Sequence, residues 1–80
     1  MTPNESKLRE ILCDILEIEP GDLTDDGSFI DDYDADSLRS VEILAALEKE
    51  FGVAISEKEL PNMNTAGQVK HVLSQYGWKA

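Results

Sequence analysis

The sequence predicts an all-α fold: a small four-helix bundle with three longer helices, one short helix and a long loop between the first two helices. Three separate stretches repeat apolar residues at the three- and four-residue spacing of an amphipathic helix. Residues that cap helices stand at the borders of these stretches, and no stretch alternates long enough to build a sheet. Eighty residues leave room for one hydrophobic core, so we expect a single domain over residues 1–80.

The first helix is expected to begin at Pro3 and to be ended by Pro20-Gly21. Thr2 suits the N-cap position, Pro3 suits the first helical position, and Glu5 can reach back to complete a capping box. The stripe that faces the core is expected to be Leu8, Ile11, Leu12, Ile15 and Leu16. Cys13 lies on the flank of this stripe, where we expect a half-buried filler rather than a reactive thiol.

Residues 19–36 show no sustained period and form a loop that is long for a compact domain. Its apolar residues should anchor it to the helices, with one helical turn around Ser28 to Ile30: Leu23, Phe29, Ile30 and Tyr33. Its charged residues are all acidic: Glu19, Asp22, Asp25, Asp26, Asp31, Asp32, Asp34 and Asp36. Like charges at close range disfavour ionisation, so we expect the pKa values of these aspartates to be raised in the fold.

A calcium-binding loop is the obvious alternative for this acidic segment. Asp32, Asp34 and Asp36 fit the first, third and fifth positions of an EF-hand loop. The sixth position would then be Ser37, where glycine is required, and the twelfth would be Ile43, where glutamate is required. We therefore expect no dedicated metal site, although weak divalent binding by clustered carboxylates stays open beside a solvated loop.

The second helix is expected to run from Ser37 to Phe51 and to be closed by Gly52 in a left-handed conformation. Two capping arrangements fit its start, with either Asp36 or Ser37 as the N-cap. Both place the Ser37 hydroxyl beside unpaired backbone N–H groups. A phosphate ester on Ser37 would lie near these donors and the positive end of the helix dipole, which makes Ser37 the main candidate for modification.

The apolar residues of this second helix fall on two faces. One face should pack into the core and consists of Ile43, Leu44, Leu47 and Phe51. The other consists of Leu38, Val41 and Ala45, and Glu42 and Glu48 flank it. Val41 borders the core stripe, so its burial stays an open alternative. An apolar strip with an acidic border has the anatomy of a weak protein interface, so we expect partners to dock on these five residues.

The C-terminal third should contain the short helix and the last long helix. Val53 and Ile55 are expected to bury their side chains in a linker. Ser56-Glu57-Lys58-Glu59 is a capping box that predicts a short helical turn through Leu60, halted by Pro61.

The last helix is expected to start at Thr65-Ala66-Gly67-Gln68 and to end at Gly77. Its inward stripe should be Val69, Val72, Leu73 and Tyr76. Trp78 either folds back as a lid or stays in a loose tail. His71 lies outside the stripe and is expected to be solvated rather than a ligand or a base.

The composition restricts the partners of the chain. Seventeen acids against 7 bases give a formal net charge of −10, which repels nucleic acid and anionic membranes and favours basic protein surfaces. One cysteine and one histidine exclude an internal disulfide framework and a Cys/His zinc site. No membrane span or secretory signal is recognisable, so we expect a cytoplasmic monomer.

The stretch Asp34-Ala35-Asp36-Ser37-Leu38 and its continuation through the helix to Gly52-Val53-Ala54-Ile55 resembles the acyl carrier proteins of fatty-acid and polyketide synthesis. The resemblance implies that Ser37 carries 4'-phosphopantetheine, with Asp36 adjacent to the modification. It also implies that a phosphopantetheinyl transferase attaches this group from coenzyme A. The loaded carrier is then expected to hold acyl groups as thioesters and to deliver them to ketosynthases, acyltransferases or other acyl-processing enzymes. The resemblance also implies that partner enzymes dock on the five residues named above for the second helix.

Catalysis by the chain itself is not expected. Nucleophilic attack by Ser37 would need a base, but His71 is the only histidine, the Gly-x-Ser-x-Gly motif is absent and Arg39 stays protonated. Asp34 and Arg39 stand where fatty-acid carriers commonly have glycine and aspartate. This difference slightly favours a role in polyketide synthesis over fatty-acid synthesis. The alternatives are a peptidyl or aminoacyl carrier, although the Gly-Gly of that branch is missing, and a small acidic helical adaptor without a prosthetic group.

Overall fold

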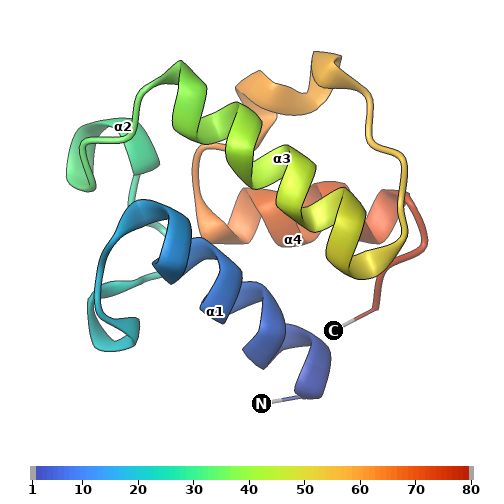
Figure 1. Ribbon diagram of the computed structural model, residues 1–80, viewed down its shortest axis with the longest axis horizontal. Coiled ribbons are helices and arrows are strands. Elements are labelled where there is room, and N and C mark those ends of the chain that lie inside the picture. The colour runs from blue at the N-terminus through green and yellow to red at the C-terminus, as the bar shows by residue number, and fades with distance from the viewer. Residues whose placement is uncertain (1, 80) are drawn as a thin grey trace.

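Three longer helices enclose one core in the computed structural model, which describes residues 2–79. In chain order the elements are α1 (Pro3–Leu16), the 3-10 turn η1 (Pro20–Asp22), α2 (Phe29–Asp32), α3 (Ser37–Phe51), the 3-10 helix η2 (Glu57–Asn62) and α4 (Ala66–Gln75) (Figure 1). No strand occurs within residues 2–79, so the predicted all-α fold is confirmed. No helix in this range is long and apolar enough to cross a membrane.

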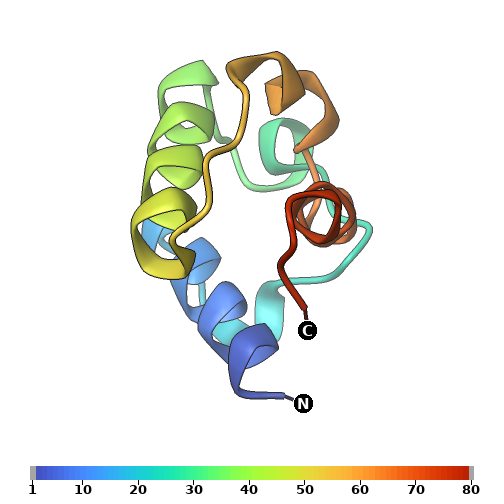
Figure 2. The same ribbon diagram turned by 90° about the vertical axis from the view of Figure 1, so that its right-hand side faces the viewer.

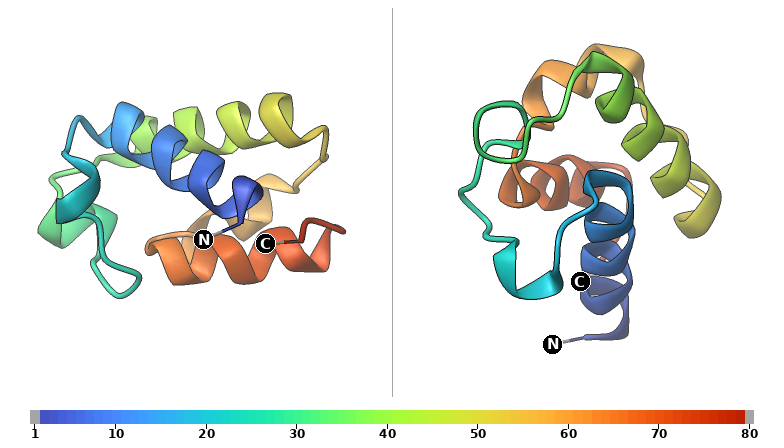
Figure 3. Two further views of the ribbon diagram at one scale, coloured as in Figure 1. Left: turned by 90° about the horizontal axis from the view of Figure 1, so that it is seen from below. Right: turned by 60° about the vertical axis from the view of Figure 1, so that its left-hand side comes forward.

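The helices form two layers with the core between them. Helices α1 and α3 lie in one layer, and α4 with η2 lies in the other (Figure 2, and Figure 3, left). The short α2 closes the end of the bundle at which α3 begins (Figure 1). The largest fully buried side chains within residues 2–79 are Leu8, Leu12, Phe29, Ile43, Leu47, Val69 and Leu73. These residues include the centre of each predicted core stripe.

Helix α1 begins as expected but ends earlier than expected. The Thr2 hydroxyl accepts from the Glu5 N–H at 3.2 Å, whereas the Glu5 carboxylate binds Lys70 instead of completing a capping box. The helix stops at Leu16 because Glu17 adopts a left-handed conformation, with φ of 59°. The prediction that Pro20-Gly21 ends this helix is therefore wrong, since Pro20 begins the separate turn η1. Cys13, expected half-buried, is buried.

The long loop is anchored by three of the four predicted residues. Leu23 and Phe29 are buried, and Tyr33 is half-buried. The Tyr33 hydroxyl accepts from the Thr24 N–H at 3.1 Å and donates to the Asp22 carbonyl at 3.0 Å, which pins the outer part of the loop. Ile30 is 54% exposed, so its predicted anchoring role is wrong. The expected helical turn near Ser28 is α2.

The C-terminal third also differs from expectation at one proline. Pro61 lies inside η2 rather than halting it, because a 3-10 helix of six residues loses only one donor there. Thr65 caps α4 as expected, accepting from the Gln68 N–H at 3.0 Å. Trp78 folds back as a lid, is buried and meets Phe51 edge-on with ring centroids 5.8 Å apart.

Candidate functional site

The structure places Ser37 at the first helical position of α3. Of the two capping arrangements, the one with Asp36 as N-cap is present: its carboxylate Oδ1 accepts from the Arg39 N–H at 3.0 Å. The carboxylate therefore satisfies the third N–H of the helix and fixes the direction in which α3 starts. Asp36 and Ser37 are both exposed.

The hydrogen-bonding groups around Ser37 suit a phosphate ester. Within residues 2–79 the Ser37 hydroxyl makes no hydrogen bond, and neither does the backbone N–H of Ser37 or Leu38. These two donors lie at the positive end of a 15-residue helix. A phosphate bound to the hydroxyl would meet free donors rather than displace existing bonds. The residues present therefore fit the phosphopantetheine group.

The segment before Ser37 makes a tight turn at Asp34. Asp34 has φ of 55°, a left-handed conformation that glycine adopts freely and that aspartate tolerates better than most residues. Ala35 is buried, and its N–H donates to the Phe29 carbonyl at 2.8 Å. The turn and this bond bring the chain from α2 to the start of α3. The positive φ gives a physical reason why glycine or aspartate suits position 34.

Arg39 connects the start of α3 to the end of α1. Its guanidinium donates to the Ile15 carbonyl and pairs with the Glu17 carboxylate at 3.0 Å. A cation at the last carbonyls of a helix is favourable because that end carries the negative pole of the dipole. Arg39 is thus directed at α1 and is not part of the exposed apolar face of α3.

Four of the five predicted docking residues are exposed together on α3. Leu38 is 64% exposed and Val41 is 48% exposed, which decides the open question about Val41. Ala45 and Glu42 are also exposed. We call these four residues, Leu38, Val41, Glu42 and Ala45, the α3 strip.

Glu48 differs from the other predicted docking residues. It is half-buried, and its Oε2 accepts from the Ile55 N–H at 3.1 Å. The carboxylate thus holds the linker that follows α3.

The acidic loop is held by cations that come from elsewhere in the chain. Asp25 pairs with Arg9 of α1 at 2.6 Å and with Lys70 of α4 at 3.0 Å, and Lys70 also pairs with Glu5 at 2.9 Å. The hydrogen bond from Lys70 is the main cause that lowers the pKa of Asp25. Hydrogen bonds to Glu5 and then to Asp25 raise the pKa of Lys70. The expected upward shift is therefore wrong for Asp25.

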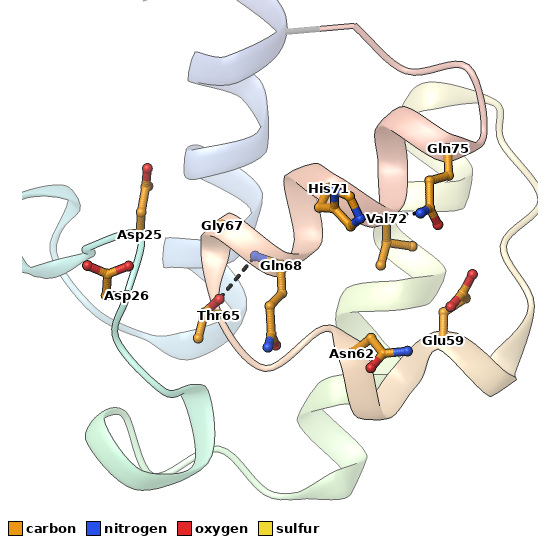
Figure 4. Close-up of a pocket in the computed structure, with 10 residues that line it drawn as sticks. All are labelled: Asp25, Asp26, Glu59, Asn62, Thr65, Gly67, Gln68, His71, Val72 and Gln75. Carbon is orange, nitrogen blue, oxygen red and sulfur yellow. Dashed lines mark hydrogen bonds between the residues drawn. The ribbon is translucent and has the colours of Figure 1, made fainter.

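A polar hollow of about 750 Å³ lies between α4, η2 and the acidic loop (Figure 4). His71 is exposed there, as expected, and its ring lies 3.3 Å from the side-chain amide of Gln75.

The other residues considered as ligands or reactive groups form no site. Cys13 is buried in α1, and desolvation by burial raises the pKa of its thiol. Within residues 2–79 no group of three or more His, Cys, Asp or Glu side chains is arranged to hold a metal ion.

A family model described as "Phosphopantetheine attachment site" matches residues 6–73, a range that contains Ser37. The chain belongs to this family, that of the acyl carrier proteins. An acyl carrier protein of Petrotoga mobilis is 42% identical over 77 residues, covering 94% of this chain and 91% of that protein. The polyketide-8 synthase acyl carrier protein 1 of Streptomyces avermitilis is 44% identical over 71 residues, covering 89% of this chain and 84% of that protein.

The fold agrees with this family. A solved structure of a putative acyl carrier protein from Mycobacterium tuberculosis superimposes with a TM-score of 0.81 at 29% identity, covering 91% of this chain and 97% of that chain. The protein is thus an acyl carrier with a phosphopantetheine attachment domain, and its cofactor is covalent 4'-phosphopantetheine. These relatives are carrier proteins rather than catalysts, and those from Streptomyces avermitilis are named as the carrier proteins of a polyketide synthase.

Proposed function

We propose that Ser37 is the attachment residue, and that residues 1–80 act as one carrier domain for acyl intermediates of fatty-acid or polyketide synthesis. The observation that carries the proposal is the exposed, unbonded hydroxyl of Ser37 beside two free N–H groups at the start of α3. Relatives named as polyketide-synthase carriers and a relative named only as an acyl carrier protein share similar identity with the chain. Both acyl cargo classes therefore belong to the proposal.

Each residue at the site has a defined part in this function. Asp36 fixes the helix start, and the free N–H groups of Ser37 and Leu38 can donate to the phosphate. A phosphopantetheinyl transferase would join the phosphopantetheine of coenzyme A to the Ser37 oxygen and release the nucleotide part. The bound arm supplies a thiol that holds an acyl group as an activated thioester.

Delivery requires repeated weak docking. The α3 strip offers apolar contacts beside an acidic residue, and the net charge of −10 attracts basic partner surfaces. We propose that ketosynthases, acyltransferases and the transferase itself dock there, and that the carrier acts as a cytoplasmic monomer. Tethering raises the effective concentration of the acyl group at each docked enzyme, so no single contact needs to be strong.

Intact-mass spectrometry tests the attachment residue. The chain is treated with coenzyme A and a promiscuous phosphopantetheinyl transferase, with Ser37→Ala as the variant and Ser40→Ala in the same helix as its matched control. Wild type and Ser40→Ala should gain one phosphopantetheine, and Ser37→Ala should gain none. An adduct on Ser37→Ala contradicts the assignment of Ser37 and places the group on another residue. No adduct on folded wild type contradicts the proposal and favours an adaptor without a prosthetic group.

A further inference from the structure

Asn64 lies in the short connection between η2 and α4, and all of its polar atoms are hydrogen-bonded to other parts of the chain. Its carbonyl accepts from the Phe29 N–H at 2.7 Å, and its side-chain Oδ1 accepts from the Ile30 N–H at 3.3 Å. Its side-chain Nδ2 donates to the Ser28 hydroxyl at 2.7 Å, and its own N–H donates to Gln68 Oε1 at 2.8 Å. One residue thereby joins α4 to the start of α2.

Helix α2 depends on these contacts because it is too short to be stable by itself. It spans only Phe29–Asp32, and an isolated helix of that length does not form in water. Of its first three N–H groups, Asn64 satisfies two and Ser28 satisfies the third, that of Asp31, at 3.1 Å. Figure 2 shows α2 beside the chain that connects η2 to α4.

Helix α2 in turn holds the segment that leads to the modification residue. The Phe29 carbonyl accepts from the Ala35 N–H at 2.8 Å, and Ala35 is buried next to the N-cap residue Asp36. The continuous path therefore runs from Asn64 through Phe29 to Ala35 and ends at Ser37. A shift of α2 would move the turn at Asp34 and the direction in which α3 begins.

We propose that Asn64 is a positioning residue, which fixes α2 and through it the segment Ala35–Ser37 for the transferase. The inference rests on the proposed role of Ser37 and adds a residue that lies far from Ser37 in the sequence. Its side chain contributes two of the bonds, so substitution by alanine removes these while the Asn64 carbonyl still accepts from the Phe29 N–H.

The test compares Asn64→Ala with Asn62→Ala, a matched control at an exposed asparagine whose side chain makes no hydrogen bond within residues 2–79. Amide hydrogen exchange is measured by NMR at Ile30 and at Val69 in α4. In Asn64→Ala the protection of Ile30 should fall by roughly fivefold to tenfold, the effect of one net hydrogen bond, while Val69 keeps its protection. Asn62→Ala should leave both unchanged.

Transferase kinetics supply the second measurement. The KM for the carrier should rise by roughly fivefold in Asn64→Ala with kcat little changed, because a displaced segment weakens recognition rather than chemistry. Asn64→Asp keeps an acceptor for the Ile30 N–H and can accept from the Ser28 hydroxyl, so it should recover part of both losses. This variant keeps the test decisive if Asn64→Ala does not fold.

Three outcomes overturn the proposal. In the first, Asn64→Ala has the same hydrogen exchange and the same KM as Asn62→Ala. In the second, Ile30 and Val69 lose protection equally in Asn64→Ala, which would make Asn64 a residue of general stability. The third is that Asn64→Asp behaves no better than Asn64→Ala. Failure of the Ser37 assignment is distinguishable, because wild type would then gain no mass while the exchange experiment would still report on the Asn64 contacts.

Discussion

The carboxylate of Asp25 lies 3.0 Å from the ammonium group of Lys70, which is 45 residues further along the chain. The same carboxylate lies 2.6 Å from the guanidinium of Arg9. The backbone carbonyl of Asp25 also accepts from the Gly67 N–H at 3.0 Å. One aspartate therefore ties the long loop to both α1 and α4. Lys70, which Glu5 also holds, is the largest cause of the lowered pKa of Asp25.

We predict that Asp25→Asn lowers the melting temperature at pH 7 and that this difference shrinks as the pH falls below about 4. A lowered carboxyl pKa contributes stability that is fully present above the unfolded pKa and is lost as the pH falls through the folded pKa. The Asp25 side chain is 47% exposed, so the expected effect is that of surface ion pairs, about 1 kcal/mol or roughly 4–8 °C. Thermal melts followed by circular dichroism at pH 7, 5 and 3 measure it.

The control for this prediction is Asp26→Asn. Asp26 is the neighbouring exposed carboxylate and forms no ion pair within residues 2–79. It should show little difference from wild type at any pH. If Asp25→Asn and Asp26→Asn shift the melting temperature equally, the ion pairs of Asp25 do not stabilise the loop.

Arg39 of α3 makes two contacts with the end of α1. Arg39→Ala should lower the melting temperature by several degrees, because the Ile15 carbonyl and the Glu17 carboxylate both lose their partner. Arg39→Lys should recover only part of the loss, since a single ammonium group does not reproduce the planar fork of arginine. The same melts, with Lys49→Ala as an exposed control on α3, give the comparison. Full recovery by lysine would contradict the two-point contact.

The third prediction separates the exposed face of α3 from its core face. Leu38→Ala and Val41→Ala should change the free energy of unfolding little, because both side chains are largely solvent-exposed. Leu47→Ala, on the buried face of the same helix, should cost about 2–5 kcal/mol. Urea denaturation measures all three. A large loss in Leu38→Ala would show that the α3 strip belongs to the core.

The α3 strip should then divide into two kinds of binding effect. Glu42→Lys should slow association with a basic partner enzyme, most strongly at low salt, because exposed charge acts on encounter. Val41→Ala should shorten the lifetime of the complex with little salt dependence, because an apolar contact acts on dissociation. Surface plasmon resonance at two salt concentrations resolves both rates. Identical salt dependence in the two variants would contradict this division.

The parts of the fold that were predictable from sequence are those with local causes. The bounds of α3 at Ser37 and Phe51 follow from a capping residue, a helical period and a glycine, each within a few positions of the border. Its core face follows from the same period. The end of α1 was missed because Glu17 takes a left-handed conformation without being glycine, whereas Pro20-Gly21 resembles a stop signal.

The contacts that position the site could not be predicted because they join distant residues. Arg39 and Ile15 are 24 positions apart, and Asn64 and Ser28 are 36 positions apart. No period in the sequence specifies such a pairing, and an asparagine in a connection is equally compatible with full exposure. The exposure of Ile30 has the same origin, since the direction of a four-residue helix depends on what holds it.

The edge-on contact between Trp78 and Phe51 gives the protein an intrinsic optical probe. Trp78 is the only tryptophan in the chain, and it packs on Phe51 at the last residue of α3, whereas Ser37 is the first residue of this helix. A helix of 15 residues is about 22 Å long, so this ring is remote from the Ser37 oxygen at which the group would be attached. Its fluorescence can therefore report the unfolding of unmodified and modified carrier on one common scale.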